Sequence, residues 1–582
     1  MTRVLAPSYI GFRTKTIPKD LVAGLTVWAV LIPESLAYAG LAGVPPVVGL
    51  YAAVPSLLLY SLLGTSRQLI VSPMSATAAL SAGVVAMIAP KGDTAAYLAL
   101  STTLALTTGI MALLAGALRL GFVASFISEP VLKGFIIGMA LTIMIGQVPD
   151  LLGIEKGSGN FFEKLAHVLT QLGDVSGLTL LVGGSCLVLV LLLKRFVPLL
   201  PGSLLVALAG IGAVAAFGLD QQGLEIVGQI DSGLPQLGLP DISGKDFLDL
   251  LGPSVGVMLL GFAEGLGAAK TYAAKEGYDI DPNRELLGLG LSNLGSGLAS
   301  GMVVNGSLSK TAVNGSAGAK SQLSAITASV LTVLTLLFLT GVFEKLPEAT
   351  LAAVVIAAVL ELINFRALRR LWRVRNTKLA KAHQLTARVD FVAAVAALIG
   401  VLVFDTLPGL IIGIGVSLAL LVARTARPHV AVLAPVGTSP RLWVDMSRHP
   451  GYPTTPGVLA VRVEAPLFFA NADYVRDRVT ELAADVDHLR LVILDGRSTP
   501  SIDLTAVEML VQLKTDLREL GVDLVLAGNI GQVRDVLDTA GSEGEPDLVQ
   551  TLDDALPATS TDETAPRSPR TGEPSGRTDD ES

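Results

Sequence analysis

The sequence predicts a polytopic α-helical membrane protein followed by a small α/β domain. Hydrophobic residues make up 51% of the 582 residues and charged residues only 16%, whereas soluble domains carry about 25% charged residues. Charges are sparse over long stretches before residue 425, and the chain after about residue 440 has the composition of a soluble domain. Strand-like and helix-like segments alternate in that last part, which is typical of an α/β domain.

The composition excludes several classes of protein. Such low charge excludes a wholly soluble enzyme, and a single cysteine, Cys186, excludes a secreted domain built on disulfides. The net charge of −8 argues against a nucleic-acid partner. The five histidines lie outside the predicted spanning cores and form no metal-ligand cluster, and no P-loop is present. We therefore expect no cofactor, no metal and no enzymatic activity.

Residues 1–20 are predicted to be a cytoplasmic N-terminal segment. They are polar and basic, and no small-residue cleavage site follows before the apolar run that begins at Leu21. This first apolar run is therefore expected to remain as a membrane helix.

Apolar runs long enough to span a membrane fill the region 21–425, which is the predicted transmembrane transport domain. A spanning helix needs about 20 mostly apolar residues. The strong candidates are 21–41, 47–63, 95–118, 122–148, 175–197, 202–219, 250–273, 285–303, 323–343, 349–364, 388–406 and 408–424. Two weaker stretches, 74–89 and 307–322, lie between them, and together they make fourteen segments.

The basic residues predict the orientation of these segments. Most of them follow even-numbered segments: Arg67, Arg119, Lys194, Arg195, Lys275, Arg284, Lys320 and the run Arg366, Arg369, Arg370, Arg373, Arg375, Lys378 and Lys381. Cytoplasmic loops are enriched in Lys and Arg, and an even number of spans returns the chain to the same side. We expect a bacterial cytoplasmic (inner) membrane protein with both termini in the cytoplasm.

The remainder of the chain is predicted to form a second domain. Residues 426–457 are assigned to a linker and the first elements of this domain, 458–556 to its body and 557–582 to a disordered acidic tail. Strands are expected at 458–463, 491–494 and 522–527, and amphipathic helices at 472–484 and 504–520.

The two weak segments point to a transport site. Interrupted segments at corresponding places in two halves of a transporter mark a site between inverted repeats, and these are the third and the tenth of fourteen. Helix N-termini present free N–H groups to anions. Two such ends, at Met74-Ser75-Ala76 and Ser309-Lys310-Thr311, would form an anion site, with Lys310 adding a full charge. The alternative is that the Ser, Thr and Gly residues here only permit close helix packing.

Two carboxylates lie inside predicted spans. Glu34 is next to Pro33 in the first segment and Glu264 is in the eighth. An intramembrane ionisable residue indicates a functional site, and burial disfavours the charged form of a carboxylate, so both are candidate proton carriers. Permanent pairing with Lys310 or with a backbone donor is the alternative for each.

Four motifs carry a family resemblance, and they occur in order along residues 15–425. They are IPESLAYAGLAGVPPVVGLY, GTSRQLIVSPMSATAAL, KEGYDIDPNRELLGLGLSNLGSG and VVNGSLSKTAVNGSAGAKSQLS. The chain resembles the SulP (sulfate permease) family, and residues 440–555 resemble the STAS domain that usually follows. The resemblance implies a seven-plus-seven inverted repeat, in which a core unit (segments 1–4 and 8–11) carries an anion past a gate unit (segments 5–7 and 12–14), as an elevator. It also implies a homodimer.

The resemblance assigns roles at the anion site. Ser309 and Lys310 match a Ser-Arg pair that lines it, with Lys in place of Arg. Met74 and Ser75 match the start of the third helix, and Tyr38 matches an aromatic residue that covers the anion.

The resemblance also favours protons over sodium. Glu34 falls where proton-coupled members have Glu, and Glu264 matches an eighth-helix acid tied to cation coupling. Ala268 stands where sodium-coupled members carry a Thr. In the STAS region Asp503 is followed by Leu504 rather than by a phosphorylatable Ser, so no phospho-switch is expected.

The predicted function is secondary active transport of a small inorganic or carboxylate anion, with sulfate favoured, by proton-coupled symport. Bicarbonate or C4-dicarboxylate symport remains an alternative, as does an uncoupled anion exchanger or channel. A membrane-tethered signalling platform is the third class. The expected partners are the anion, protons and the lipid bilayer.

Overall fold

The computed structural model divides into two compact units, one up to Leu420 and one from Leu421 onward. It describes residues 6–9, 14–90, 92–122, 128–157, 159–197, 201–360, 363, 366, 369, 372–373, 386–404, 406–436, 442–449, 451–528, 531–540 and 545–556. The predicted acidic tail and the basic residues Arg370, Arg375, Lys378 and Lys381 lie outside the described residues.

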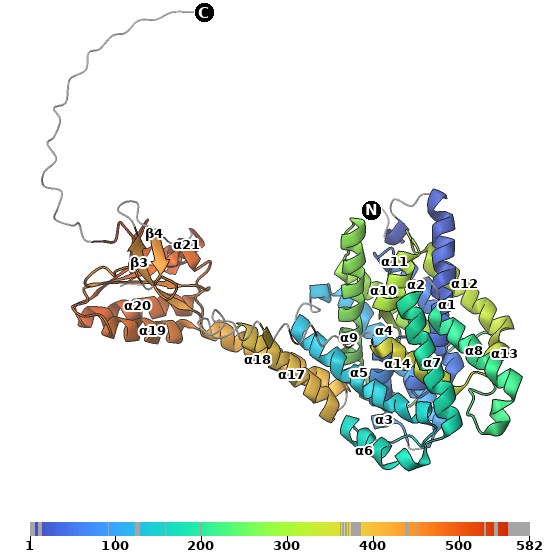
Figure 1. Ribbon diagram of the computed structural model, residues 1–582. Coiled ribbons are helices and arrows are strands. Elements are labelled where there is room, and N and C mark those ends of the chain that lie inside the picture. The colour runs from blue at the N-terminus through green and yellow to red at the C-terminus, as the bar shows by residue number, and fades with distance from the viewer. Residues whose placement is uncertain are drawn as a thin grey trace, which may run out of the picture. The chain divides into compact units, whose positions relative to one another are not determined.

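The first unit is a bundle of helices (Figure 1). Its first half contains α1 (Ile17–Leu41), α2 (Pro46–Leu63), α3 (Ser75–Ile88), α4 (Thr94–Ala117), α5 (Glu129–Leu152), α7 (Gly177–Phe196) and α8 (Gly202–Phe217). Its second half contains α9 (Gly244–Glu276), α10 (Pro282–Leu298), α11 (Leu308–Ser316), α12 (Leu323–Phe338), α14 (Glu348–Leu360), α17 (Thr386–Phe404) and the greater part of α18 (Thr406–Ala426). The last residues of α18, from Leu421 onward, belong to the second unit. Each predicted segment corresponds to one of these helices.

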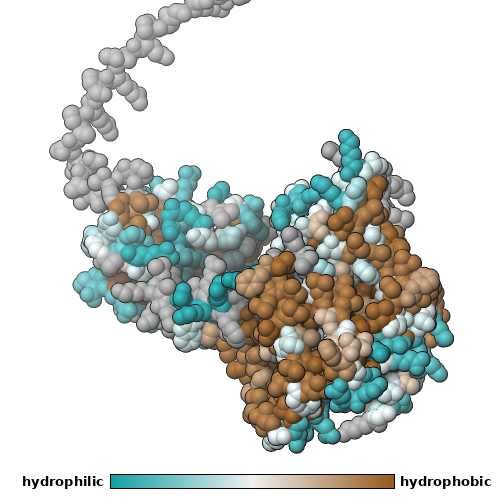
Figure 2. Space-filling view, turned by 45° about the vertical axis from the view of Figure 1, so that its right-hand side comes forward, coloured by the Kyte–Doolittle hydropathy of each residue, from teal (hydrophilic) through white to brown (hydrophobic). Residues whose placement is uncertain are grey.

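Seven described helices are long and apolar enough to cross a membrane by length and composition, and five shorter apolar helices accompany them. Apolar residues cover a broad band of this unit's surface in Figure 2, with hydrophilic residues toward its ends. This band is the surface expected of a helical unit that faces lipid. The polytopic helical fold is therefore confirmed.

One of the described α-helices of the first unit lies outside every predicted segment. Helix α6 (Phe161–Thr170) is capped by Asn160, which accepts from the N–H groups of Phe162 and Glu163, while the Glu163 side chain accepts from the Asn160 N–H. Such a capping box satisfies donors that would otherwise be free at a helix start. Helix α6 has 10 residues and is too short to be detected with a window set for membrane spans. The predicted segment 323–343 is divided into α12 and the single turn α13 (Thr340–Phe343).

A two-stranded ribbon holds the starts of α3 and α11 together. Strand β1 (Ile70–Ser72) pairs antiparallel with β2 (Asn305–Ser307), in a register that places Val71 opposite Gly306. Each strand leads directly into one of the two short helices. Because the strands are antiparallel, the two helices start at opposite ends of the same ribbon, as an inverted repeat requires.

The helices pack as two sets. In the first set, α1 packs on α2, α3, α11 and α12, while α4 packs on α3, α9 and α10. In the second, α5 packs on α7, α14 and α17. Close approach depends on small residues: Gly49 of α2 lies against the carbonyl of Ser35, and Gly134 of α5 against that of Ala394, so neither leaves room for a Cβ atom.

The second unit contains a six-stranded sheet in the order β4-β3-β5-β6-β7-β8. The strands are β3 (Val430–Val436), β4 (Leu442–Asp445), β5 (Val458–Val463), β6 (Leu491–Asp495), β7 (Asp523–Ala527) and β8 (Asp547–Val549), and the helices are α19 (Ala472–Ala484), α20 (Leu504–Glu519) and α21 (Gly531–Ala540). Strands β5 to β8 are parallel, and β3 is antiparallel to both of its neighbours. The predicted strands and helices are all present, β3 and β4 are the first elements within 426–457, and β8 and α21 are additional.

The sheet of the second unit is covered on both faces. Val475 of α19, Leu510 of α20 and Val533 of α21 belong to one apolar cluster. Trp443 and Leu552 belong to a separate cluster with Ile493 of the sheet. This arrangement explains why β6 is apolar along its whole length rather than alternating.

Candidate functional site

The starts of the two short helices are built differently. Helix α3 begins at Ser75, after the extended residue Met74, and has no side-chain cap. Helix α11 is capped by Ser307, whose hydroxyl accepts from the N–H of Lys310 at 3.3 Å and lies 3.1 Å from the hydroxyl of Ser309. The first turn of α3 therefore keeps N–H groups with which it can bind a ligand.

Lys310 links the two half-helices. Its ammonium is 1% exposed, donates to the carbonyl oxygen of Pro73 at 2.8 Å and lies 3.2 Å from Glu34 Oε2. It also lies 5.0 Å from the centre of the Tyr38 ring, a cation–π distance. The fold thus brings Glu34, Tyr38 and Lys310 together at the start of α3.

Glu34 and Lys310 form a buried pair of opposite charges. Glu34 is 5% exposed, so one buried carboxylate faces one buried ammonium. A buried charge is costly unless it is paired and hydrogen-bonded. Glu34 is the partner of Lys310, and this pairing is one of the alternatives that the sequence analysis gave for Glu34. The nearby helix start of α3 adds a partial positive charge, equivalent to about half an elementary charge.

The remaining residues predicted for the anion site differ in burial and in their contacts. Ser75 and Ala76 are buried in the first turn of α3, and Ser309 is exposed on α11. Thr311 is fully buried, and its hydroxyl accepts from the N–H of Ile70 at 3.1 Å. Thr311 therefore holds strand β1 in place.

Glu264 lies on α9, which packs on β2, α3 and α11. Gly261 and Gly265 lie against Asn305 of β2, so the neighbouring Glu264 is close to the ribbon. Its Oε2 atom is buried and has no hydrogen-bond partner among the described residues. No ion pair or hydrogen bond of the described residues joins Glu264 to Lys310, and Ala268, one turn on, is buried.

Two further buried carboxylates escaped the sequence analysis. Asp20, in the first turn of α1, accepts from the N–H groups of Lys320 and Ser321 and from the Ser321 hydroxyl. It therefore fixes the start of α12 to α1. Its only signal in the sequence is an acid at the beginning of the first apolar run.

Glu285 is the second of these carboxylates. It accepts from the Tyr60 hydroxyl at 2.6 Å and from the N–H of Thr65 at 2.7 Å. These bonds tie α10 to the end of α2, so Glu285 supports the first set of helices. Its position in the DPNRELLGLG motif was the available signal.

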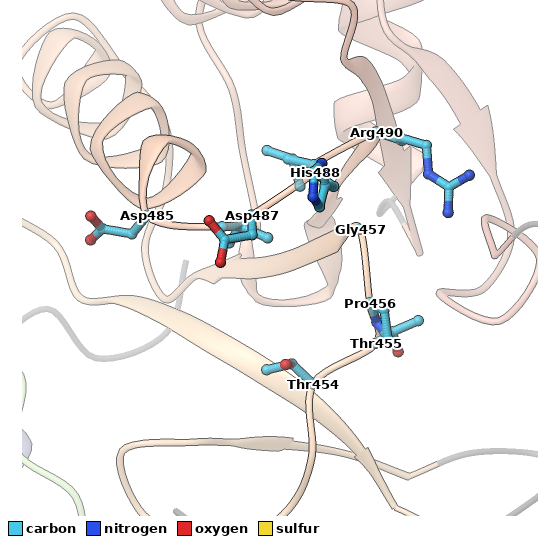
Figure 3. A pocket seen from close by; sticks show the side chains of 10 residues that line it. Thr454, Thr455, Pro456, Gly457, Asp485, Asp487, His488 and Arg490 are labelled. Atoms are coloured by element: carbon cyan, nitrogen blue, oxygen red, sulfur yellow. The ribbon is translucent and has the colours of Figure 1, made fainter.

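An open depression lies in the second unit. It encloses about 890 Å³ and is lined by the loops that precede β5 and β6. In Figure 3 the Asp485 and Asp487 carboxylates lie on one side and the Arg490 guanidinium extends away on the other. These charged groups do not point toward a common centre. The cluster at the starts of α3 and α11 is therefore the better candidate for an anion-binding site.

The carboxyl end of strand β6 carries a buried carboxylate with two partly exposed arginine partners. Asp495, which is 0% exposed, accepts from Arg462 and Arg497 at 2.7–2.9 Å. Burial acts to raise the pKa of the Asp495 carboxyl, but the hydrogen bonds from Arg497 and Arg462 outweigh it and lower that pKa. Asp503 caps α20 through the N–H of Ala506, and no phosphorylatable residue follows it directly.

Comparisons with known proteins agree with this architecture. The profile of the sulfate permease family matches residues 17–381, and that of the STAS domain matches residues 449–555. A protein of Mycobacterium tuberculosis named probable sulfate transporter is 36% identical over 560 residues, which cover 95% of this chain and 98% of the relative. A probable sulfate transporter (4.2) of Arabidopsis thaliana is 32% identical over 561 residues, which cover 92% of this chain and 80% of the relative.

A solved structure shares the whole fold. The murine Solute Carrier 26 family member A9 anion transporter superimposes with a TM-score of 0.83 at 23% identity, over 95% of this chain and 93% of that chain. At this identity the likeness concerns the fold, whereas the family follows from the sequence matches. The chain belongs to the sulfate permease family of anion transporters, which are membrane transport proteins rather than enzymes, and carries a C-terminal STAS domain.

Proposed function

We propose that this protein takes up a small anion, with sulfate favoured, together with protons. The observation that carries the proposal is the buried Lys310–Glu34 pair, 3.2 Å apart, at the start of the half-helix α3. The names of the relatives support sulfate, and the site supports any small anion with acceptor oxygens. Met74, Ser75, Ala76, Tyr38, Ser309 and Lys310 are proposed to surround the anion, with Thr311 as a positioning residue.

Charge balance explains the proposed coupling. When Glu34 is ionised it neutralises Lys310, so the site offers little net charge to a dianion. When Glu34 takes up a proton, the full charge of Lys310 and about half a charge from each of two helix starts become available. Their sum is close to the two negative charges of sulfate. An anion and a proton would therefore occupy the site together.

Glu264 is the second proposed proton carrier. Its buried Oε2 has no partner among the described residues, whereas the carboxylates Asp20 and Glu285 are hydrogen-bonded several times over. A carboxyl group without fixed donors is free to change its protonation state without breaking a structural contact. The buried Ala268 offers no side-chain oxygen for a sodium ion at this point.

The mechanism is proposed to be an elevator. The proposed anion site is built from α1, α3, α11 and the β1–β2 ribbon, all of which belong to the first helix set. Because none of the residues proposed to surround the anion lies in the second set, the first set is proposed to carry the anion as a rigid body. We also propose a homodimer in the cytoplasmic (inner) membrane of a bacterium, with both termini in the cytoplasm.

The test is transport by purified protein in liposomes. Wild type is expected to concentrate labelled sulfate in response to an inward proton gradient. Glu34→Gln keeps the shape of the side chain but carries no proton, so it should lose gradient-driven accumulation while retaining sulfate exchange. Glu264→Gln is measured in parallel, and bicarbonate and C4-dicarboxylates are offered as competitors.

The outcomes separate the alternatives. If Glu34→Gln still concentrates sulfate under the gradient and Glu264→Gln does not, Glu264 is the carrier. If both variants and wild type exchange sulfate without responding to the gradient, the protein is an uncoupled exchanger or channel. Inhibition of sulfate uptake by bicarbonate or a C4-dicarboxylate at lower concentration than by sulfate itself would reassign the substrate.

A further inference from the structure

An exposed apolar tip lies at one end of the STAS domain. It consists of Phe468, Phe469 and Leu504, and in it Phe469 is 72% and Leu504 is 60% exposed. The rings of Phe468 and Phe469 meet edge to face at 5.5 Å. Nothing in the transport chemistry or in the core of the domain uses these side chains.

The tip is rigid. The N–H of Phe469 donates to the Asp503 carboxylate at 2.9 Å, and that of Phe468 to the side-chain oxygen of Asn471 at 3.0 Å. The N–H of Asp503 in turn donates to the carbonyl of Leu467 at 3.2 Å. The two segments that carry the apolar side chains are therefore held side by side, and their exposure is a property of the folded domain.

The same loop is fastened to the last turn of α18. Asn471 is fully buried, and its side-chain amide donates both to the Pro466 carbonyl at 2.9 Å and to the Thr425 carbonyl at 3.3 Å. Phe468 and Phe469 thus lie two to three residues before Asn471, which contacts the last turn of α18.

The length of α18 places that point at a membrane surface. Helix α18 has 21 residues, which at about 1.5 Å per residue cover about 30 Å, the thickness of the hydrocarbon core. Thr425 follows the last large apolar residue, Val422, by three positions, so it lies about 4–5 Å beyond it. The headgroup layer on each side is about 5–7 Å thick. The Asn471 loop is therefore at headgroup level.

The charges at this level suit a lipid surface. Arg424 and Arg427 are exposed around the end of α18, and cationic side chains near the membrane attract anionic headgroups. Segments that insert into the membrane–water interface typically combine exposed Phe and Leu side chains with such cations.

We propose that Phe468, Phe469 and Leu504 insert into the headgroup layer of the membrane that α18 spans and so anchor the STAS domain to lipid. The anchor would hold the carboxyl ends of the parallel strands toward the bilayer. It depends on α18 being a membrane span and does not depend on the identity of the transported anion.

The experiment measures lipid contact directly in the full-length protein. In a Cys186→Ala background, single cysteines replace Phe469, Leu504 or Leu520 and carry a small environment-sensitive fluorophore. Leu520 is the matched control, because it is 71% exposed and lies at the C-terminal end of α20, which begins at Leu504. The labelled proteins are placed in vesicles of phosphatidylethanolamine and phosphatidylglycerol, with and without a lipid that carries a spin label near its headgroup.

The expected result is a severalfold larger loss of fluorescence at positions 469 and 504 than at 520 when the spin-labelled lipid is present. Equal and small losses at all three positions would show that the tip faces water and would overturn the proposal. A blue-shifted emission at 469 and 504 without quenching by the lipid would also overturn it, because the tip would then be covered by protein.

Discussion

Lys310 donates to the Pro73 carbonyl and faces Glu34, so a single side chain connects the half-helix that carries it to α1 and to the start of the other half-helix. The same ammonium is the only full positive charge among the residues that are proposed to surround the anion. Its role as a structural link and its role as an anion ligand therefore have to be separated by experiment.

Lys310→Ala is expected to weaken sulfate affinity by about 10- to 100-fold. Charge-assisted hydrogen bonds contribute about 1.5–3 kcal/mol, and about 1.4 kcal/mol corresponds to a factor of ten. Lys310→Arg should be milder because the charge remains. Calorimetry on the purified protein measures the affinity.

Controls are needed because Lys310→Ala also strands the Glu34 carboxylate. The double variant Lys310→Ala with Glu34→Gln removes that unpaired charge, and it should recover folding without recovering affinity. Lys320→Ala is the matched lysine control, since its partner Glu276 is partly exposed. Wild-type affinity in a folded double variant would make Lys310 a structural counter-charge only.

Asp495→Asn is expected to destabilise the STAS unit by about 1–3 kcal/mol, because charge-assisted hydrogen bonds are lost while Arg462 and Arg497 stay partly hydrated. The folded-state pKa of Asp495 is lowered, so its contribution is present above the unfolded pKa of about 3.9. It is lost as pH falls through the lower folded value. Hydrogen exchange of the β6 backbone in the full-length protein measures the change.

Glu481→Gln serves as the surface comparison for Asp495→Asn. Glu481 pairs with Arg478 on the exposed face of α19, and exposed pairs contribute about 0–1 kcal/mol. Its effect on exchange should be small at every pH. An equal effect of the two substitutions would mean that the Asp495 pair does not hold the sheet.

At the level of elements, the β1–β2 ribbon positions both half-helices, and α9 supports it from one side. The contact between α9 and β2 is a backbone contact: a Cβ atom added to Gly306 would lie 2.8 Å from the Cα atom of Gly265. No flexible side chain is available to give way there. The geometry of the proposed site therefore depends on the absence of two side chains.

Gly306→Ala is expected to displace β2, lower sulfate uptake severely and destabilise the transport unit by about 1–3 kcal/mol, the usual cost of overpacking. Gly267 lies on the exposed face of α9, the helix that Gly306 contacts, and a Cβ atom added there would meet nothing within 4 Å. Gly267→Ala should therefore retain both stability and uptake. Thermal unfolding and liposome uptake of the two variants provide the comparison. Equal behaviour of both would show that the ribbon tolerates displacement.

At the level of the whole molecule, the proposed anion site and the STAS domain lie in different compact units. Every proposed ligand of the anion precedes residue 325, within the unit that ends at Leu420. The STAS unit contains its own apolar clusters and a complete sheet. The anion site should therefore form without the STAS domain.

Truncation after Arg427, before β3 begins, is expected to leave sulfate affinity unchanged within about a factor of two, which is about 0.4 kcal/mol. Transport rate or abundance in the membrane is expected to fall, because the STAS domain and its lipid anchor are lost. Calorimetry on the purified truncated protein is the measurement. Loss of binding by a protein that remains folded would place part of the site in the STAS unit.

The sequence by itself determined the transmembrane segments and the family. Hydropathy and the distribution of charge are local properties of the chain, so the fourteen segments and the α/β character of the C-terminal domain could be read from them. Short elements without a strong local signal, such as α6, β4 and β8, could not. The half-helices were detectable because polar residues at membrane depth stand out against their apolar surroundings.

Only the tertiary structure decided how these residues meet. Glu34, Pro73 and Lys310 lie in different segments, and no local pattern states that β1 pairs with β2 or that Lys310 faces Glu34 rather than Glu264. Such contacts depend on which residues the packing of α1, α9 and the ribbon brings within hydrogen-bond distance. The same holds for Thr311, which accepts from the N–H of Ile70 in β1, and for Asp20, which accepts from Lys320 and Ser321 before α12. A buried N–H or hydroxyl group needs an acceptor, and only the folded chain decides which acceptor lies within reach.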